Sequence, residues 1–504
     1  MRIRHTAGAV AASACAAACL AAVAAPPATA APPFPVDMSC VSPAGDPAPG
    51  TPAWFQRDAA NEYCASLRNR DQLTNPAFGV GNLSQGASLW ADQLAEQVGD
   101  GAGHIHGGIT TLIPGSQAAD PFRTIARWTE EGRGSVVPIK FLADDGAQLR
   151  GHIFMPPKTI RKPRAGYPAV VITDGSVQAY ENLYFWAAED LASHGYMVMT
   201  YDVQGQGDSD LFPANCPNPA DALASCPGVP YQQNYNFYQG AEDSLNFLLS
   251  SPRHRFGGSY DPEYRDLNRN EVAIAGHSLG AAAVSVVGQC DTRVKTIVAW
   301  DDLDPITEAD CQTVNIPKAD RTPAAELIHT PALALTNDYL FNTEPMSSPP
   351  DPHSKDGGYQ QLVKAGVDSE IVAFRGATHL TYTYIPLVFQ ASELDERMAS
   401  YYTLAWLDYD LRHRASGYAR LTAKAFDSSA DTDSIGAGVW DPAKAVPGDP
   451  YSGNVPYKIK GIEVKNAVSF YYLSEYALRD PSGALATCAD MRRDNCQIPS
   501  FGTP

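Results

Sequence analysis

The stretch EVAIAGHSLGAAA, residues Glu271–Ala283, decides the fold of this chain. Its first part, Glu271–Ala275, predicts a buried strand, and the small residues from Ala281 onward can begin a helix. Between them stands GHSLG (Gly276–Gly280), which has the pattern G-x-S-x-G. The pentapeptide alone is a weak signal, because Gly and Ser are common in loops. Between a strand and a helix, it predicts the sharp turn that exposes a nucleophilic serine.

The residue types of this turn fit a nucleophile elbow. Gly276 and Gly280 carry no side chain, as the crowded backbone around Ser278 requires, and His277 completes the turn before the serine. The start of the following helix directs backbone N–H groups at a developing oxyanion. We expect Leu279, the residue after the nucleophile, to donate one of them.

Outward from this stretch, short apolar runs alternate with segments long enough for helices. Ser135–Leu142 and Gln148–Met155 flank an Asp-Gly turn and predict an antiparallel hairpin. Leu394–Leu411 has the spacing of a closing helix. The other predicted strands are Ala169–Thr173, Tyr196–Tyr201, Glu271–Ala275, Thr296–Trp300, Ala332–Leu335 and Glu370–Phe374. This rhythm predicts an α/β fold, a mostly parallel central sheet with helices on both faces.

A serine nucleophile needs a base and an orienting carboxylate. Asp338 ends the run that begins at Ala332, and His379 follows the run that begins at Glu370, so the chain order is Ser278, Asp338, His379. This is the order of serine hydrolases built on a parallel sheet. Asp301 or Asp302, which follow the preceding strand, could orient the histidine instead. We favour Asp338 because it lies immediately before the unit that carries the histidine.

Two other histidines compete with His379 as the base. His353 lies in a loop rich in Pro and Ser, and His329 precedes a strand. Neither has the position after a strand that the base requires.

The second oxyanion donor should come from the loop after Ala169–Thr173. This loop reads Asp174-Gly175-Ser176, and we predict that the backbone N–H of Ser176 is the donor. Gly175 would let the loop approach the elbow closely. The competing interpretation of Asp174-Gly175 is an ordinary turn.

With these motifs in place, the chain from Ser135 to Arg412 resembles the α/β-hydrolase superfamily. Tyr201–Ser209, YDVQGQGDS, resembles the family's D-x-R-G-x-G-x-S loop, with Gln204 in place of the usual arginine. Gly151–Pro156, GHIFMP, resembles the start of the dienelactone hydrolase and acetylxylan esterase branch. The resemblance implies ester hydrolysis through an acyl-serine intermediate, with neither a metal nor an organic cofactor.

These features predict a serine hydrolase that cleaves small-molecule or polymeric carboxylic esters. A serine peptidase would use the same three residues, so peptide substrates stay an alternative. A non-catalytic binding protein on this fold would be expected to have lost the Ser, His or Asp, and all three are present. The sequence does not indicate the oligomeric state.

The chain is predicted to have five parts. Residues 1–30 read as a secretory signal, because Arg2 and Arg4 precede an Ala-rich apolar run that ends in Ala28-Thr29-Ala30. A Pro/Ala-rich leader (31–53), an N-terminal helical extension (54–130), the catalytic domain (131–412) and a C-terminal extension (413–504) follow. In the extension, Trp90, Leu94 and Val98 recur at helical spacing. We expect a secreted, extracellular protein.

Eight cysteines remain after the signal, an even number for a compartment that permits disulfides. Each lies near a partner in sequence, so the simplest hypothesis is four local bridges in chain order. Zinc is the rival interpretation, but no CxxC or HxxxH spacing accompanies them. The pairs are Cys40–Cys64, Cys216–Cys226, Cys290–Cys311 and Cys488–Cys496.

Composition excludes several classes of partner. Of 504 residues, 37 are Lys or Arg and 56 are Asp or Glu, and this formal net charge of −19 argues against binding to nucleic acid. Beyond the signal, no stretch approaches a membrane-spanning length, so we expect no stable membrane insertion. His104 and His106 lie in a Gly-rich loop, which we interpret as a plain loop without a metal, since no carboxylate or cysteine joins them at ligand spacing.

Overall fold

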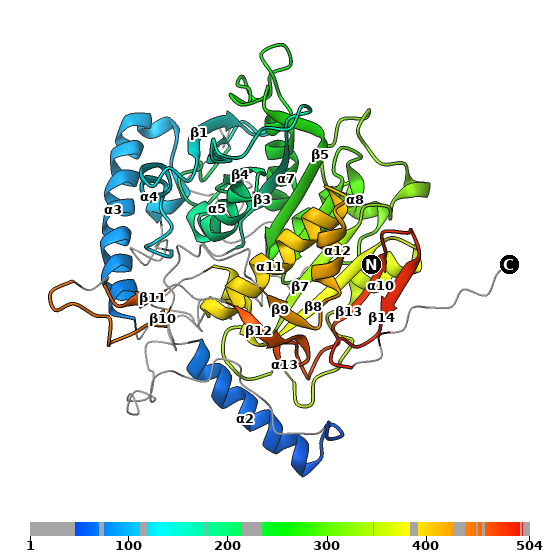
Figure 1. The fold of residues 1–504 in the computed structure, drawn as a ribbon. Helices are drawn as coiled ribbons and strands as arrows, with labels where there is room; N and C mark the ends of the chain where they lie inside the picture. The colour runs from blue at the N-terminus through cyan, green and yellow to red at the C-terminus, as the bar shows by residue number, and fades with distance from the viewer. Residues whose placement is uncertain are drawn as a thin grey trace.

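The structure of this protein is a computed structural model with one large sheet (Figure 1). The sheet has ten strands in the order β1-β2-β4-β3-β5-β6-β7-β8-β13-β14. Strands β4, β3, β5, β6, β7 and β8 run parallel, and antiparallel strands extend the sheet at both ends. This confirms the predicted α/β class. The structure describes residues 46–69, 75–110, 119–176, 179–213, 234–345, 347–383, 392–427, 439–449, 452–455, 459–493 and 496.

The strands of the parallel part are buried on both faces, and alternate side chains enter two separate cores. In β3, for example, Val170 and Ile172 face one core, and Ala169 and Val171 face the other. Strands that are buried on both faces appear in the sequence as continuous apolar runs, which is why they could be predicted. Their bounds are β3 Tyr167–Thr173, β4 Met197–Tyr201, β5 Leu267–His277, β6 Thr296–Trp300, β7 Ala332–Tyr339 and β8 Ser369–Thr378.

Helices cover both faces of this sheet. The first core is closed by α5 (Phe185–Ser193) and α11 (Glu393–Asp410). The second is closed by α7 (Asn234–Leu248), α8 (Leu279–Cys290) and α10 (Gly357–Lys364). The predicted hairpin is present as β1 (Ser135–Leu142) and β2 (Gln148–Met155), and β2 pairs antiparallel with β4. Within the described ranges, short 3-10 turns connect the elements at η3 Gly101–Gly103, η4 Gly107–Thr110, η5 Glu181–Tyr184, η7 Ala324–Glu326 and η8 His379–Tyr382.

The N-terminal extension is helical, as expected, and consists of α2 (Pro52–Arg68), α3 (Pro76–Asp100) and α4 (Ile125–Glu130). Helix α2 begins at the side-chain cap of Thr51, and α3 begins at that of Asn75. Apart from Phe78 near its start, helix α3 turns small and polar residues inward. Its apolar residues Val80, Leu83, Trp90, Leu94 and Val98 are exposed, so the apolar spacing located the helix but not its buried face.

The C-terminal extension continues the central sheet. Strand β13 (Glu475–Arg479) pairs antiparallel with β8, and β14 (Leu485–Cys488) forms the last strand (Figure 1). The remaining elements are α12 Ala415–Leu421, β9 Ala425–Asp427, β10 Val439–Trp440, β11 Asn454–Val455, β12 Lys460–Glu463 and α13 Val464–Ala467. The tail therefore protects an edge of the sheet that would otherwise end at β8.

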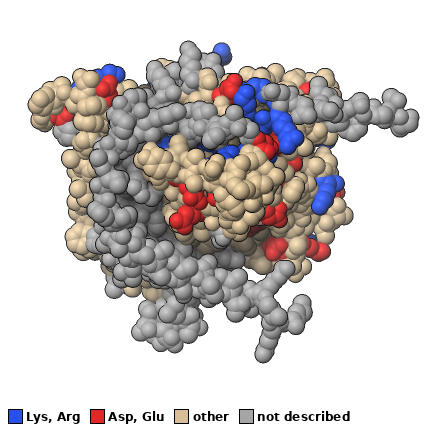
Figure 2. Space-filling model, turned by 90° about the horizontal axis from the view of Figure 1, so that it is seen from below, with Lys and Arg blue, Asp and Glu red and all other residues tan. Residues whose placement is uncertain are grey.

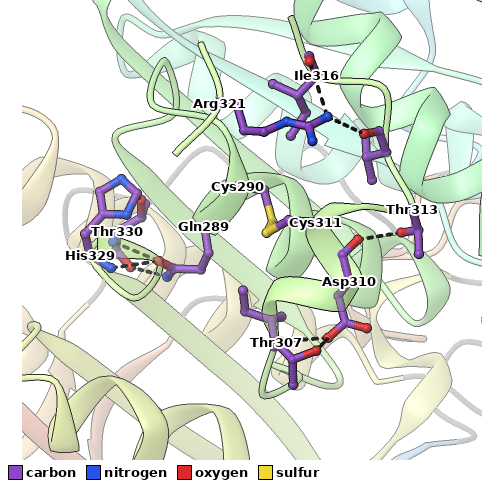
Figure 3. The surroundings of a disulfide bond; sticks show 12 residues. Gln289, Cys290, Thr307, Asp310, Cys311, Thr313, Ile316, Arg321, His329 and Thr330 are labelled. Carbon is purple, nitrogen blue, oxygen red and sulfur yellow. Dashed lines mark hydrogen bonds between the residues drawn. A yellow bond between two sulfur atoms is a disulfide. The ribbon is translucent and has the colours of Figure 1, made fainter. Parts of the chain in front are cut away.

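Two of the predicted disulfides have both cysteines among the described residues, and both are formed. Cys290–Cys311 joins the end of α8 to α9 (Glu308–Cys311), and Figure 3 shows the hydrogen bonds of Thr307, Asp310 and Arg321 around it. Cys488–Cys496 closes the C-terminal region. Cys64 is also disulfide-bonded, whereas Cys40, Cys216 and Cys226 lie outside the described residues.

The described surface carries both signs of charge. In the view from below, acidic and basic side chains lie in small separate groups (Figure 2). Among the described helices, none is both long and apolar enough to cross a membrane. The predicted signal, residues 1–30, lies outside the described part of the chain.

Candidate active site

Ser278 sits at the turn between β5 and α8, as the sequence predicted. Its φ is 57°, in the left-handed region that non-glycine residues rarely adopt. Both glycines are required by close approach: a Cβ on Gly276 would collide with the carbonyl of Gly280, and a Cβ on Gly280 would collide with the carbonyls of Thr173 and Asp174. Ser278 is half-buried, so its hydroxyl stays within reach of a substrate.

The structure brings His379 to Asp301, and not to Asp338. His379 follows β8, and its Nδ1 lies 2.7 Å from Oδ2 of Asp301. Asp301 directly follows β6, and its backbone N–H donates to the carbonyl of Leu335. Its other carboxylate oxygen accepts a hydrogen bond of 2.5 Å from the hydroxyl of Thr336. The carboxylate therefore holds the imidazole with Nδ1 protonated and leaves Nε2 available as a base.

Asp338 has a different place, so its predicted contact with the histidine is wrong. It is still inside β7 and fully buried, and its Oδ2 accepts hydrogen bonds from Asn61 of α2 at 3.1 Å and from the backbone of Gly376 at 2.6 Å. Asn61 also accepts from Arg375 at 2.8 Å. Asp338 therefore links α2 to the end of β8. The acid that contacts His379 is Asp301, the alternative considered from the sequence.

Lys355 keeps Asp301 ionised. Burial opposes the charge of Asp301, but the Lys355 ammonium 3.6 Å away and the hydrogen bond from His379 together lower the pKa of Asp301 far below its usual range. The neighbouring Asp302 shows the reverse, because burial and the charge of Asp301 raise its pKa to about 8. Two adjacent carboxyls thus differ in charge at neutral pH, and the ionised one contacts the histidine.

A chain of hydrogen bonds links the loop after β3 to His379 through His277, the residue before Ser278. The backbone N–H of Gly175 donates to the hydroxyl of Tyr184 at 2.8 Å, and that hydroxyl lies 2.9 Å from Nδ1 of His277. Nε2 of His277 lies 2.8 Å from the carbonyl of His379, which can only accept, so Nε2 carries the proton. Burial and His379 lower the pKa of His277 to about 3, which keeps this ring neutral.

The loop predicted to supply the second oxyanion donor lies against the elbow. The carbonyl of Asp174 is in contact range of Gly280, and Gly175 packs against His277. Gln206 braces the loop by donating to Oδ2 of Asp174 at 3.1 Å and to the carbonyl of Gly175 at 2.8 Å. Burial raises the pKa of Asp174 well above its ordinary value. The donor roles of Leu279 and Ser176 stay predictions.

The two competing histidines lie elsewhere. His353 Nδ1 contacts Asp356 at 2.6 Å, and His329 Nε2 lies 3.2 Å from the hydroxyl of Thr330. Beside His379, the partly exposed ring of Phe341 lies edge-on with centroids 5.8 Å apart.

Sequence reasoning placed Tyr184 near the predicted active-site loops but missed its hydrogen bonds to Gly175 and His277, and it missed Lys355 altogether. Lys355 lies far from any strand end and reaches the site through its long side chain, which donates to the carbonyl of Asn337 at 2.7 Å. Tyr184 belongs to η5, and its ring is fully buried, as an ordinary core aromatic would be. No local motif marks either residue.

This chain is similar to a protein named as a thiohydrolase over part of its length. No protein-family model matches the chain. Thiohydrolase apmlB from Arthrinium phaeospermum is similar to it, with 29% identity over 161 residues, which is 32% of this chain and 41% of that protein. The aligned part spans less than half of this relative. The similarity indicates an enzyme of hydrolytic type.

Proposed function

We propose that this protein is a serine hydrolase of the α/β-hydrolase superfamily that cleaves carboxylic esters. The observation that carries the proposal is the pairing of His379 with an ionised Asp301, together with a serine at φ 57° whose preceding residue, His277, contacts the carbonyl of His379. The resemblance to the dienelactone hydrolase and acetylxylan esterase branch stays a prediction. So does secretion, which the disulfides support because such bonds persist in oxidising compartments.

In the proposed reaction, His379 Nε2 takes the proton of Ser278 as the serine oxygen attacks the ester carbonyl carbon. The carbonyl π bond opens, and the resulting oxyanion is held by backbone N–H groups, for which Leu279 and Ser176 are our candidates. The intermediate then collapses, the carbon–oxygen bond to the alcohol breaks, and His379 returns the proton to that alcohol. Water attacks the acyl-serine by the same steps, and the acid leaves.

A thioester is the second candidate substrate, and the name of the similar protein favours it. The acyl half of the reaction is unchanged, because only the leaving group differs: the carbon–sulfur bond breaks, and a thiol departs. An oxygen ester and a thioester of the same acid therefore share the acyl group that Ser278 would attack. The relative hydrolysis rates of such matched pairs distinguish the two substrate classes.

The test is hydrolysis of p-nitrophenyl esters of increasing chain length, of matched acyl thioesters and of p-nitroanilide peptides, by the wild type and by S278A. We expect ester turnover that S278A abolishes. Thioester turnover that exceeds ester turnover on the same acyl group would move the assignment to the second candidate. Anilide turnover with little ester activity would make the protein a peptidase, and activity that survives in S278A would contradict the proposal.

A further inference from the structure

Three potential metal ligands from separate segments converge outside the proposed active site. They are Glu96 of α3, His106 of the Gly-rich loop after it, and Asp208 of the loop after β4. One ligand atom from each lies within 4.8 Å of the others. In sequence these residues are too dispersed to form a motif, which is why the loop was interpreted as having no metal.

His106 has the arrangement of a metal ligand, because one of its ring nitrogens has no hydrogen-bond partner among the described residues. Its side chain is completely buried, and Nε2 is held by Asp100 at 3.0 Å. Among the described residues, Nδ1 has no hydrogen-bond partner, although a buried polar atom normally has one. A histidine ligand typically has this arrangement, in which a carboxylate orients one nitrogen and the metal takes the other.

Asp208 offers a second unpaired atom. Its Oδ1 is buried and has no hydrogen-bond partner in the described part of the chain. The carboxylate therefore adds a second unpaired buried atom to the cluster that contains His106. Two unsatisfied buried acceptors in one cluster are costly unless something with positive charge occupies the space between them.

The charges around the three residues and their access to solvent are also compatible with a bound cation. The carboxylates of Glu96, Asp100 and Asp208 face Arg150, which is 2.5 Å from one oxygen of Glu96 and also contacts Asp100. Lys140 contacts Asp100 from its other side at 3.2 Å. These cations neutralise Glu96 and Asp100 from outside, and no cation of the described segments is hydrogen-bonded to Asp208. The side chain of Glu96 is 46% exposed, so an ion can enter from solvent.

We propose that Glu96, His106 and Asp208 bind one divalent transition-metal ion of the Zn²⁺ class. An imidazole with two carboxylates suits Zn²⁺, whereas Ca²⁺ and Mg²⁺ prefer ligand sets made only of oxygen. Asp100 is the positioning residue, because it holds Nε2 of His106. Three protein ligands leave a coordination position for water.

The bound ion would join the N-terminal helices to the loop that supports the proposed active site. The loop of His106 already pairs with the loop after β4, since Gly107 donates to Ser209 at 2.9 Å and Gly108 donates to Gly207 at 2.7 Å. Gln206 of that second loop holds Gly175. An ion bridging His106 and Asp208 therefore stabilises the contact between both segments.

The test is calorimetric titration of the chelator-treated, full-length protein with Zn²⁺, together with thermal unfolding. We expect one Zn²⁺ per chain, a rise of the unfolding temperature with Zn²⁺, and much weaker binding of Ca²⁺. E96Q, H106Q and D208N should each weaken Zn²⁺ binding by at least about 100-fold, and D100N by about 10–100-fold. Glu96 is on the surface, so E96Q keeps the test valid if a buried variant fails to fold.

Two histidine variants are matched controls. His104 lies in the same loop but contacts Asp210 at 2.8 Å, so H104Q should bind Zn²⁺ as the wild type does. His353, Asp356 and Glu475 form another cluster with ligand spacing, in which Nδ1 of the exposed His353 already contacts Asp356. Binding that H353Q removes and E96Q keeps would contradict the proposal, as would no Zn²⁺ binding or equal binding of Ca²⁺.

Discussion

Nδ1 of His379 lies 2.7 Å from Oδ2 of Asp301, and this contact joins the ends of two strands that are 78 residues apart in the chain. The acid that reaches the histidine follows β6, not β7. Asp338, near the end of β7, instead accepts hydrogen bonds from Asn61 and Gly376. The two carboxylates therefore have separable roles, one in orienting the base and one in holding α2.

Exchanging each acid for its amide should separate these roles. D301N should lower kcat for an ester by about 10⁴-fold, because the amide no longer favours the His379 tautomer with Nε2 free. D338N should keep kcat within a few-fold of the wild type and lower the thermal stability, since the N–H groups of Asn61 and Gly376 lose a carboxylate acceptor. Steady-state kinetics and thermal unfolding of both variants measure this. A large loss of kcat in D338N alone would restore Asp338 as the orienting acid.

Tyr184→Phe should remove hydrogen bonds that support the proposed active site without removing a reacting group. The change leaves the N–H of Gly175 and Nδ1 of His277 without the shared hydroxyl, at a cost of about 1–3 kcal/mol in stability. We expect kcat to fall with little change in KM, because the oxyanion loop and His379 lose their common support.

Tyr180→Phe is the matched control for that change. Tyr180 is a buried tyrosine of the same segment, and its hydroxyl accepts from Gln93 of α3 rather than contacting His277. It should lose stability and keep kcat. Equal effects of Y180F and Y184F on kcat would show that the link through His277 has no role in turnover.

Lys355→Met should change the pH profile of hydrolysis. Loss of the ammonium removes a charge that lowers the pKa of Asp301, so this pKa rises toward its ordinary value. Protonated Asp301 cannot stabilise a charged imidazole, and the acid limb of kcat/KM should therefore move to higher pH. Profiles of K355M and the wild type between pH 4 and pH 9 test this. An unshifted acid limb would exclude Lys355 as a positioning residue.

Stability should decrease from about pH 4 to pH 7. Burial raises the pKa of Asp243 and of Asp261 to about 7 each, well above the unfolded value near 4. Between those values the folded state binds more protons than the unfolded state, so the free energy of unfolding falls as pH rises, by up to about 1.4 kcal/mol per pH unit for each group. Asp100, with its pKa lowered to about 2, acts oppositely at acid pH and adds stability that is lost below about pH 4.

Chemical denaturation across this pH range measures the effect. D243N removes one of the two groups and should flatten the slope. The same slope in D243N and in the wild type would mean that Asp243 does not titrate between the folded and unfolded states.

The sequence predicted the sheet well because its strands are short apolar runs with both faces buried, and β6 was predicted residue for residue. It also placed Ser278 and His379 at strand ends, since strand direction sets where the chain turns. It could not choose between Asp301 and Asp338. That choice depends on Asn61, which comes from α2 and lies 277 residues from Asp338 in the chain. The sequence also did not predict which face of α3 is buried, because that face consists mostly of small and polar residues.

The most direct test of the account is labelling with a serine-reactive phosphonate, followed by mass spectrometry of the modified peptide. The account predicts an adduct on Ser278 in the wild type and in D338N at comparable rates, much slower labelling of D301N and none of S278A. An adduct on another residue, or slow labelling of D338N beside normal labelling of D301N, would contradict the catalytic unit of Ser278, His379 and Asp301.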